Sequence, residues 1–193
     1  SLRPVHNRTG KSDDKETTPE ELAEEAQKYG LIAYYRPHGS IQTLKAFIAN
    51  DIPVVVRTLL ENEQDYAHYR VIKGYDDMAS QLINDDSYQG ANIPFSYDYF
   101  LKIWRPFNYG YLVLVTPDKQ RVVESIIGED LDLAVAWNNA AKVAQQELEK
   151  NPADTRAGFN LSVALYYLGN YQQSVEAFEK VEAQLPVHTL WYQ

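Results

Sequence analysis

The chain has 193 residues, and 45% of them are hydrophobic, so it has room for one medium domain or two small ones with a buried core. Its net charge is −9 and it has no cluster of Lys and Arg, so we do not expect it to bind nucleic acid. No apolar run approaches the roughly 20 residues of a membrane span, and the absence of cysteine excludes disulfides, thiolate metal sites and thiol nucleophiles within these residues.

The first predicted elements are a helix and a strand. In "TTPEELAEEAQKYG", Thr18 has the position of an N-cap, Glu21 completes a capping box with it, and Gly30 stops the helix. The residues expected on the inner face of this helix are Leu22, Ala26 and Tyr29. The following "LIAYYR" predicts a strand.

The middle of the chain predicts a second helix and a set of strands. "SIQTLKAFIAN" has Ser40 as its cap and Asn50 at its end, and "IPVVVRTLL" is apolar enough for a central strand. A hairpin is expected next, with "HYRVIKGYDD" and "QLINDD" joined near Met78. "PFSYDYFLKIW" predicts a short helix and "YGYLVLVTP" a last strand. This order predicts an α+β fold with an antiparallel sheet.

From about Lys119 the pattern predicts helices only, which places a domain boundary between residues 1–118 and 119–193. The stretch 129–154 predicts one long helix that is ended by Asn151 and Pro152, and two helices with a turn at Gly169 and Asn170 follow. The spacing of small and aromatic residues in the last two matches a tetratricopeptide (TPR) hairpin, although Gly158 stands where that repeat usually has Trp. A single repeat is too short for a free solenoid, so we expect these helices to lean on the first domain.

No motif for a metal or a cofactor is present. The four histidines, His6, His38, His68 and His188, have no i,i+3 or i,i+4 spacing, and the paired Asp residues lack the spacing of a calcium loop. There is also no phosphate-binding glycine loop and no G-x-S-x-G elbow. We therefore expect neither a cofactor nor a metal.

His68 is the histidine that could belong to a catalytic site, because it begins the first strand of the predicted hairpin. The antiparallel return brings Asp85 and Asp86 close to it, to within about one residue of register. A carboxylate beside an imidazole can accept the Nδ1 proton and stabilise the cation that forms when Nε2 acts as a base. The residues alone leave two interpretations, a base with its orienter or a surface His beside solvated carboxylates.

The hairpin segments "HYRVIKGYDD" and "INDDSYQG" resemble the His and Asp segments of the C39-like cysteine peptidases, which have a papain-like fold. Three further stretches resemble the other segments of that family in order: "TTPEELAEEAQKYGLIAYYR", "LKAFIANDIPVVV" and "YDYFLKIWRPFNYGYLVLVTP". The resemblance covers residues 2–117 and implies a papain-like half-domain in which His68 is the general base. It makes Asp86 the orienter, with Asp85 as the near alternative.

The same resemblance implies a nucleophilic Cys at the start of a central helix, preceded by an oxyanion-hole Gln. No residue of this chain matches either one, and Ser1 lies in a polar segment that offers no activation. We expect either an N-terminally incomplete part of a peptidase that hydrolyses peptide or amide bonds, or a pseudo-peptidase that binds a peptide or protein. The first is favoured because a missing central helix would expose an apolar sheet.

The resemblance also leads to expectations about binding partners, origin and cellular location. The partners would be a peptide or protein and the missing N-terminal segment or another chain. The chain alone is expected to be inactive. A bacterial origin and an extracellular or cell-envelope location follow from the resemblance alone.

Overall fold

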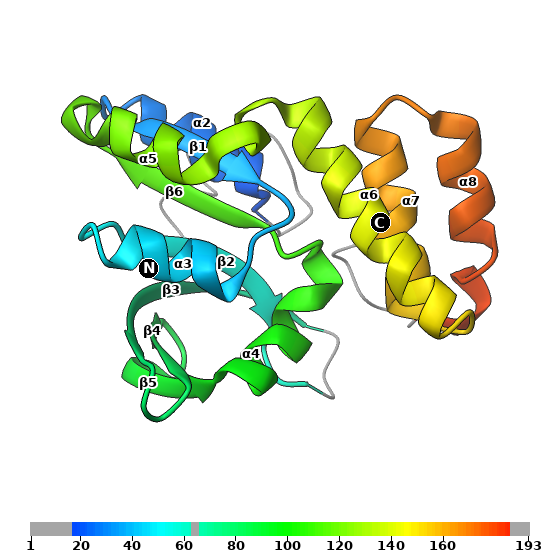
Figure 1. Ribbon diagram of the computed structural model, residues 1–193, viewed down its shortest axis with the longest axis horizontal. Coiled ribbons are helices and arrows are strands. Elements are labelled where there is room, and N and C mark those ends of the chain that lie inside the picture. Colours follow the sequence, from blue (N-terminus) through cyan, green and yellow to red (C-terminus); the bar gives the residue numbers. More distant parts are fainter. Residues whose placement is uncertain (1–16, 63–65, 186–193) are drawn as a thin grey trace.

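The structure is a computed structural model that describes residues 17–62 and 66–185. Within these residues, six strands form one antiparallel sheet in the order β1-β6-β2-β3-β4-β5 (Figure 1). The strands are β1 (Ile32–Arg36), β2 (Val54–Leu59), β3 (Ala67–Asp76), β4 (Gln81–Asp86), β5 (Gly90–Ser96) and β6 (Tyr111–Val115). The predicted α+β class and the antiparallel sheet are confirmed.

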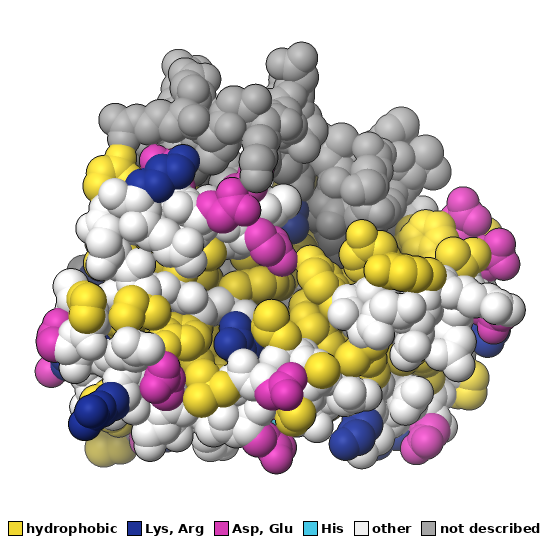
Figure 2. Space-filling model, turned by 90° about the horizontal axis from the view of Figure 1, so that it is seen from above, with side chains coloured by type: hydrophobic (Ala, Val, Ile, Leu, Met, Phe, Trp, Pro, Cys, Tyr) yellow, Lys and Arg dark blue, Asp and Glu magenta, His cyan; other side chains and the backbone are white. Residues whose placement is uncertain are grey.

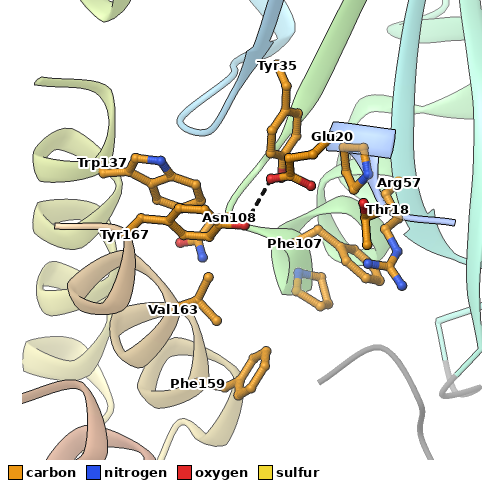
Figure 3. A pocket seen from close by; sticks show the side chains of 12 residues that line it. Thr18, Glu20, Tyr35, Arg57, Phe107, Asn108, Trp137, Phe159, Val163 and Tyr167 are labelled. Atoms are coloured by element: carbon orange, nitrogen blue, oxygen red, sulfur yellow. Dashed lines mark hydrogen bonds between the residues drawn. The ribbon is translucent and has the colours of Figure 1, made fainter. Parts of the chain in front are cut away.

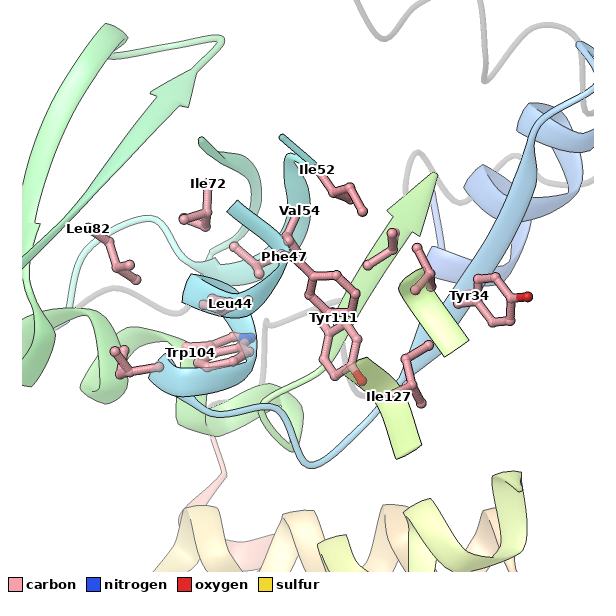
Figure 4. Packing of buried hydrophobic residues seen from close by; sticks show 14 of the residues in the cluster. Tyr34, Leu44, Phe47, Ile52, Val54, Ile72, Leu82, Trp104, Tyr111 and Ile127 are labelled. Atoms are coloured by element: carbon pink, nitrogen blue, oxygen red, sulfur yellow. The ribbon is translucent and has the colours of Figure 1, made fainter. Parts of the chain in front are cut away.

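Three helices cover one face of the sheet and enclose the main core (Figures 1 and 4). They are α3 (Ile41–Ile48), α4 (Tyr97–Trp104) and α5 (Gln120–Ile127). Their buried side chains, such as Leu44 and Trp104, pack on alternate residues of the central strands, such as Val54 and Val113, and all four are fully buried. Burial of apolar surface at this interface is the main stabilising term of the sheet.

The first helix, α2 (Pro19–Gln27), lies beside β1 and β6 (Figure 1). Its capping box is confirmed, because the Thr18 hydroxyl accepts from the Glu21 amide at 3.2 Å and the Glu21 carboxylate accepts from the Thr18 amide at 3.0 Å. Ala26 is buried as predicted, but Tyr29 is 63% exposed. The expected inner position of Tyr29 is therefore wrong, because it lies beyond the last turn of α2.

The helix predicted over "PFSYDYFLKIW" begins three residues later than expected. The first residues of this stretch belong to β5, a strand that the sequence pattern did not predict. Pro94 lies inside that strand and α4 begins at Tyr97, where the Ser96 hydroxyl accepts from the Tyr99 amide. Strand β5 is the edge of the sheet, where a residue without an N–H is tolerated. Pro94 is thus an edge-strand proline.

The C-terminal part is helical, as expected, and forms a layer beside the sheet (Figure 1). After α5 and a 3₁₀ turn, the helices are α6 (Leu133–Lys150), α7 (Thr155–Tyr167) and α8 (Tyr171–Glu179). The long predicted helix starts later than expected because Asp132 caps it, and the turn between the last two contains Gly169, with φ of 76°. The amino acids of the turn were predicted correctly.

A 3₁₀ turn, η1 (Arg105–Phe107), fastens the helical layer to the sheet. The Arg105 guanidinium lies 2.9 Å from the carboxylate of Glu147 and 2.6 Å from that of Asp154. Asn108 donates to the Asn160 carbonyl at 3.2 Å in a buried position. The helices therefore lean on the first part of the chain through buried and half-buried polar contacts.

The loop between β1 and α3 makes a close contact that gives a test of this packing. A Cβ on Gly39 would lie 2.6 Å from the buried Trp104 ring and 2.8 Å from the Tyr109 carbonyl oxygen. We expect Gly39→Ala to lower the free energy of unfolding by about 1–3 kcal/mol because neither neighbour can yield easily. Urea denaturation measures this, with Gln42→Ala on the exposed side of α3 as control; equal effects of the two variants would contradict the packing.

Candidate active site

The predicted hairpin of β3 and β4 forms with the register that the candidate residues need. Arg70 of β3 is directly opposite Asp86 of β4, and His68 is directly opposite Thr58 of β2. Because alternate residues of a strand point to the same face, His68 and Arg70 share the face that carries Ile72 and the main core. The site therefore lies at one end of the core face.

The structure brings His68 and Asp86 together. Nε2 of His68 lies 3.0 Å from Oδ1 of Asp86, whose side chain is fully buried, while that of His68 is 19% exposed. The same Oδ1 accepts from the backbone amides of Tyr88 at 2.6 Å and Gln89 at 2.8 Å. The turn after β4 thus holds the carboxylate in place.

A buried arginine completes the cluster. Nε of Arg70 lies 3.0 Å from Oδ2 of Asp86, and neither side chain is exposed. The other guanidinium nitrogens donate to the Thr58 hydroxyl, to the Leu59 carbonyl at 3.0 Å and to the Leu60 carbonyl at 2.8 Å. A buried carboxylate needs such a partner, because an uncompensated charge in the interior is costly.

The alternative orienter, Asp85, lies away from His68. It forms an ion pair with Lys73 at 2.7 Å and accepts from the Asn92 amide at 2.8 Å, and both charged groups are partly exposed. Asp85 is directly opposite Val71, and both point to the face of the sheet that His68 and Arg70 do not share. Of the two carboxylates, Asp86 is the one in contact with the imidazole.

One detail of the expected geometry is wrong. The imidazole was expected to present Nδ1 to the carboxylate, whereas Nε2 faces Asp86. An ionised carboxylate only accepts hydrogen bonds, so this contact favours the neutral tautomer with its proton on Nε2 and its lone pair on Nδ1. If the ring acts as a base, Nδ1 is the nitrogen that takes the proton.

The environment keeps Asp86 ionised. Burial raises the pKa of its carboxyl. The hydrogen bonds from the amides of Gln89 and Tyr88 and the neighbouring His68 lower this pKa by more than burial raises it, so the net pKa lies below the usual value. Burial lowers the pKa of the Arg70 guanidinium, and the charge of Asp86 opposes that shift. The pair is therefore an anion and a cation at neutral pH.

A groove lies on the opposite face of the sheet, between the strands and α2. It has a volume of about 610 Å³. Most of its lining is apolar and comes from Leu22, Ala26, Tyr29, Val55, Leu112 and Leu114. Arg70 and Asp86 form part of its wall, but His68 does not line it. Of these side chains, Tyr29 is 63% exposed, whereas Leu112 is only 2% exposed.

A second, smaller cavity of about 220 Å³ lies between the sheet and the helical layer (Figure 3). The rings of Trp137 and Tyr167 stack in parallel with centroids 4.1 Å apart, and the Tyr167 hydroxyl donates to Glu20 at 2.9 Å. Arg57 and Tyr35 line the side formed by the strands. Burial, followed by the charge of Glu20, raises the pKa of Tyr167, which therefore stays protonated and donates.

Of the other histidines, His38 lies within the described residues and is paired away from the site. Nδ1 of His38 lies 3.0 Å from Oδ2 of Asp130, near the start of the helical layer, and His6 and His188 lie outside the described residues. Across residues 17–62 and 66–185, no group of three or more His, Asp or Glu side chains is arranged to hold a metal ion. No helix in these ranges is long and apolar enough to cross a bilayer.

The fold and the site define a class: an antiparallel α+β domain with a His–Asp pair held on adjacent strands. The model of the Peptidase_C39 like family matches residues 4–112, which is more than half of the chain. The chain belongs to this family. The match includes His68 and Asp86 and ends in β6, before the helical layer. No curated protein matches the chain.

Sequence reasoning missed Arg70. Its signal was present, because Arg70 is two residues from Ile72 in a strand with period two, which puts a charge on the inward face. An inward charge requires a buried counter-charge, and the following strand offers one in Asp86. The neighbouring Lys73 has no such requirement, because it is paired at a half-exposed position.

The buried position of Asp86 predicts a large loss of stability on its removal. Asp86→Ala leaves Arg70 with an uncompensated buried charge and should lower the free energy of unfolding by about 3–5 kcal/mol. Asp85→Ala breaks only the partly exposed pair with Lys73 and should cost about 1 kcal/mol or less. Urea denaturation of both variants decides this, and similar losses would show that the Asp86 network is not needed.

The lowered pKa of Asp86 predicts how its contribution depends on pH. The contribution is complete above the unfolded pKa, about 3.9, and is lost as the pH falls through the lower pKa of the folded state. Asn at position 86 does not titrate, so the difference in unfolding free energy between the wild type and Asp86→Asn should shrink with acidification. A difference that is constant or grows would contradict the assignment. Denaturant titrations from neutral to acid pH measure it.

Proposed function

We propose that this chain supplies the general base and the orienter of a cysteine peptidase-type site, with His68 as the base and Asp86 as its orienter. The observation that supports this most is the 3.0 Å contact of Nε2 with a fully buried carboxylate on adjacent strands. The membership of the chain in the Peptidase_C39 like family adds to it. The reaction would be hydrolysis of a peptide or related amide bond.

On this proposal each ring nitrogen of His68 has its own task. Nε2–H faces Asp86, so Nδ1 takes the proton of a thiol, whose sulfur then attacks the carbonyl carbon. The same proton passes from Nδ1 to the leaving amine as the C–N bond breaks, and water later releases the acyl group. Asp86 stays ionised throughout and stabilises the imidazolium, as its lowered pKa favours.

The nucleophile has to come from outside these 193 residues, because they contain no cysteine. It would have to reach Nδ1 of His68, whose side chain is 19% exposed at the end of the core face. The apolar groove lies on the opposite face, and an apolar surface of this kind is typical of one that a further segment or partner covers. On this proposal the chain is the C-terminal part of a longer peptidase, and residues 1–118 form its peptidase-like domain.

A second candidate function is a binding module without catalysis. The cavity between the sheet and the helical layer supports it, because stacked aromatic rings and Arg57 offer both an apolar wall and a charge to a peptide. Figure 2 shows hydrophobic side chains in a band across the middle of one face of the molecule. The helices of 119–193 would add a TPR-like surface, which includes the exposed rings of Tyr166 and Tyr171.

The deciding experiment is to read the coding sequence upstream of Ser1 and to express the longer product. We expect a Gln followed by a Cys, and peptide hydrolysis that needs a reduced thiol. His68→Ala should reduce this hydrolysis at least 10²-fold, which is the usual contribution of a general base, about 10²–10⁴-fold. His38→Ala, whose imidazole pairs with Asp130 far along the chain, serves as the matched control and should retain activity.

Hydrolysis that survives His68→Ala would overturn the catalytic assignment. A longer product without any Cys would favour the binding module. In that case a peptide ligand should change the fluorescence of Trp137, which is buried against the small cavity. The 193-residue chain alone should show no thiol-dependent hydrolysis.

A further inference from the structure

We infer that Arg70 is a positioning residue that clamps the Asp86 carboxylate, so that His68 carries its proton on Nε2 and keeps its lone pair on Nδ1. Only the catalytic use of Nδ1 rests on the proposed function. The state of the imidazole is a property of this chain and can be measured without any activity.

The first step is the anchoring of the guanidinium itself. Its terminal nitrogens donate to the Thr58 hydroxyl and to the carbonyls of Leu59 and Leu60, all at the end of β2. The guanidinium is planar and rigid, so these bonds also fix the direction of Nε. Nε then points at Oδ2 of Asp86 from 3.0 Å, and the ring of Phe95 lies 5.2 Å from the guanidinium carbon.

The second step concerns the contacts of the two carboxylate oxygens of Asp86. Oδ2 faces Arg70, and Oδ1 faces His68 and accepts from the amides of Tyr88 and Gln89. Nε of Arg70 and Nε2 of His68 each lie 3.0 Å from this carboxylate as ion-pair contacts, and within the described residues neither nitrogen makes an aligned hydrogen bond. Arg70 thus prevents the carboxylate from turning its second oxygen toward the imidazole.

The third step is the balance of charge. Arg70 and Asp86 are one cation and one anion, both with fully buried side chains, and Glu61 and Tyr99 are the further titratable groups that act on Arg70. The ring of His68 therefore meets an oriented acceptor whose charge is already compensated. Orientation, more than attraction to an unpaired anion, decides which ring nitrogen holds the proton.

A purely structural role for Arg70 makes a different prediction. If the arginine only fills space beside Asp86, a folded variant without it would leave the proton on Nε2, because the Tyr88 and Gln89 amides still hold the carboxylate. If it clamps, the neutral imidazole becomes a mixture of two tautomers. The tautomer is therefore the readout that separates the two roles.

The experiment is long-range ¹H–¹⁵N NMR of the 193-residue chain with labelled histidine, at a pH where the imidazole is neutral. His68→Gln identifies the His68 signals. The wild type should show a protonated Nε2 and an unprotonated Nδ1. Arg70→Met should lose this pattern and give averaged nitrogen shifts, whereas Lys73→Met, which breaks the nearby ion pair with Asp85, should leave it unchanged.

Two further variants keep the test decisive if Arg70→Met does not fold. Arg70→Lys retains the charge without the planar fork and should restore the pattern only in part. Thr58→Val removes one anchor of the guanidinium at nearly constant volume and should also give a partial loss. A wild type with the proton on Nδ1, or folded variants that all keep the wild-type pattern, would overturn the inference.

The outcomes also separate this inference from the proposed function. A proton on Nε2 that depends on Arg70 supports the clamp even where the longer product shows no thiol-dependent hydrolysis. Hydrolysis that requires His68 but is accompanied by an unchanged tautomer in Arg70→Met and Thr58→Val would support the proposed function and overturn the clamp.

Discussion

The burial of one carboxylate constrains everything around the candidate site. Asp86 has no exposed side-chain surface, so its charge has to be met within the protein, and two segments meet it. Strand β3 contributes both His68 and Arg70, and the turn between β4 and β5 contributes the amides of Tyr88 and Gln89. A slip of one residue between β3 and β4 would move Asp86 to the other face and leave Arg70 without its counter-charge, so the electrostatics and the register support each other.

The two faces of the sheet have different tasks. The face under α3, α4 and α5 holds the apolar core and, at its end, the cluster of Arg70, Asp86 and His68. The face beside α2 is only partly covered and forms the apolar groove. Arg70 and Asp86 belong to strands that border this groove, but their charged side chains point into the core face and neither is exposed.

Local signals in the sequence predicted much of the fold. The capping box of Thr18 and Glu21 depends on residues three apart, and the hairpin depends on a turn near Met78, so both could be predicted without tertiary information. The failures have tertiary causes. Pro94 lies in an edge strand, where its missing N–H faces no partner, and Arg70 is buried because a distant residue compensates it. Likewise, antiparallel pairing predicted the approach of His68 and Asp86, but the choice of ring nitrogen depends on rotamers that no spacing specifies.

The attachment of the helical layer has a mechanical consequence. Arg105 and Asn108, which hold α6 and α7, belong to the short connection between α4 and β6, and β6 lies between β1 and β2 inside the sheet. A force exerted on the helices, for example by a tethered or pulling partner, would enter the sheet through this interior strand. The hairpin with His68 and Asp86 is separated from that point by β2, so the load would pass through two rows of backbone hydrogen bonds, β6–β2 and β2–β3, before it reached the polar cluster.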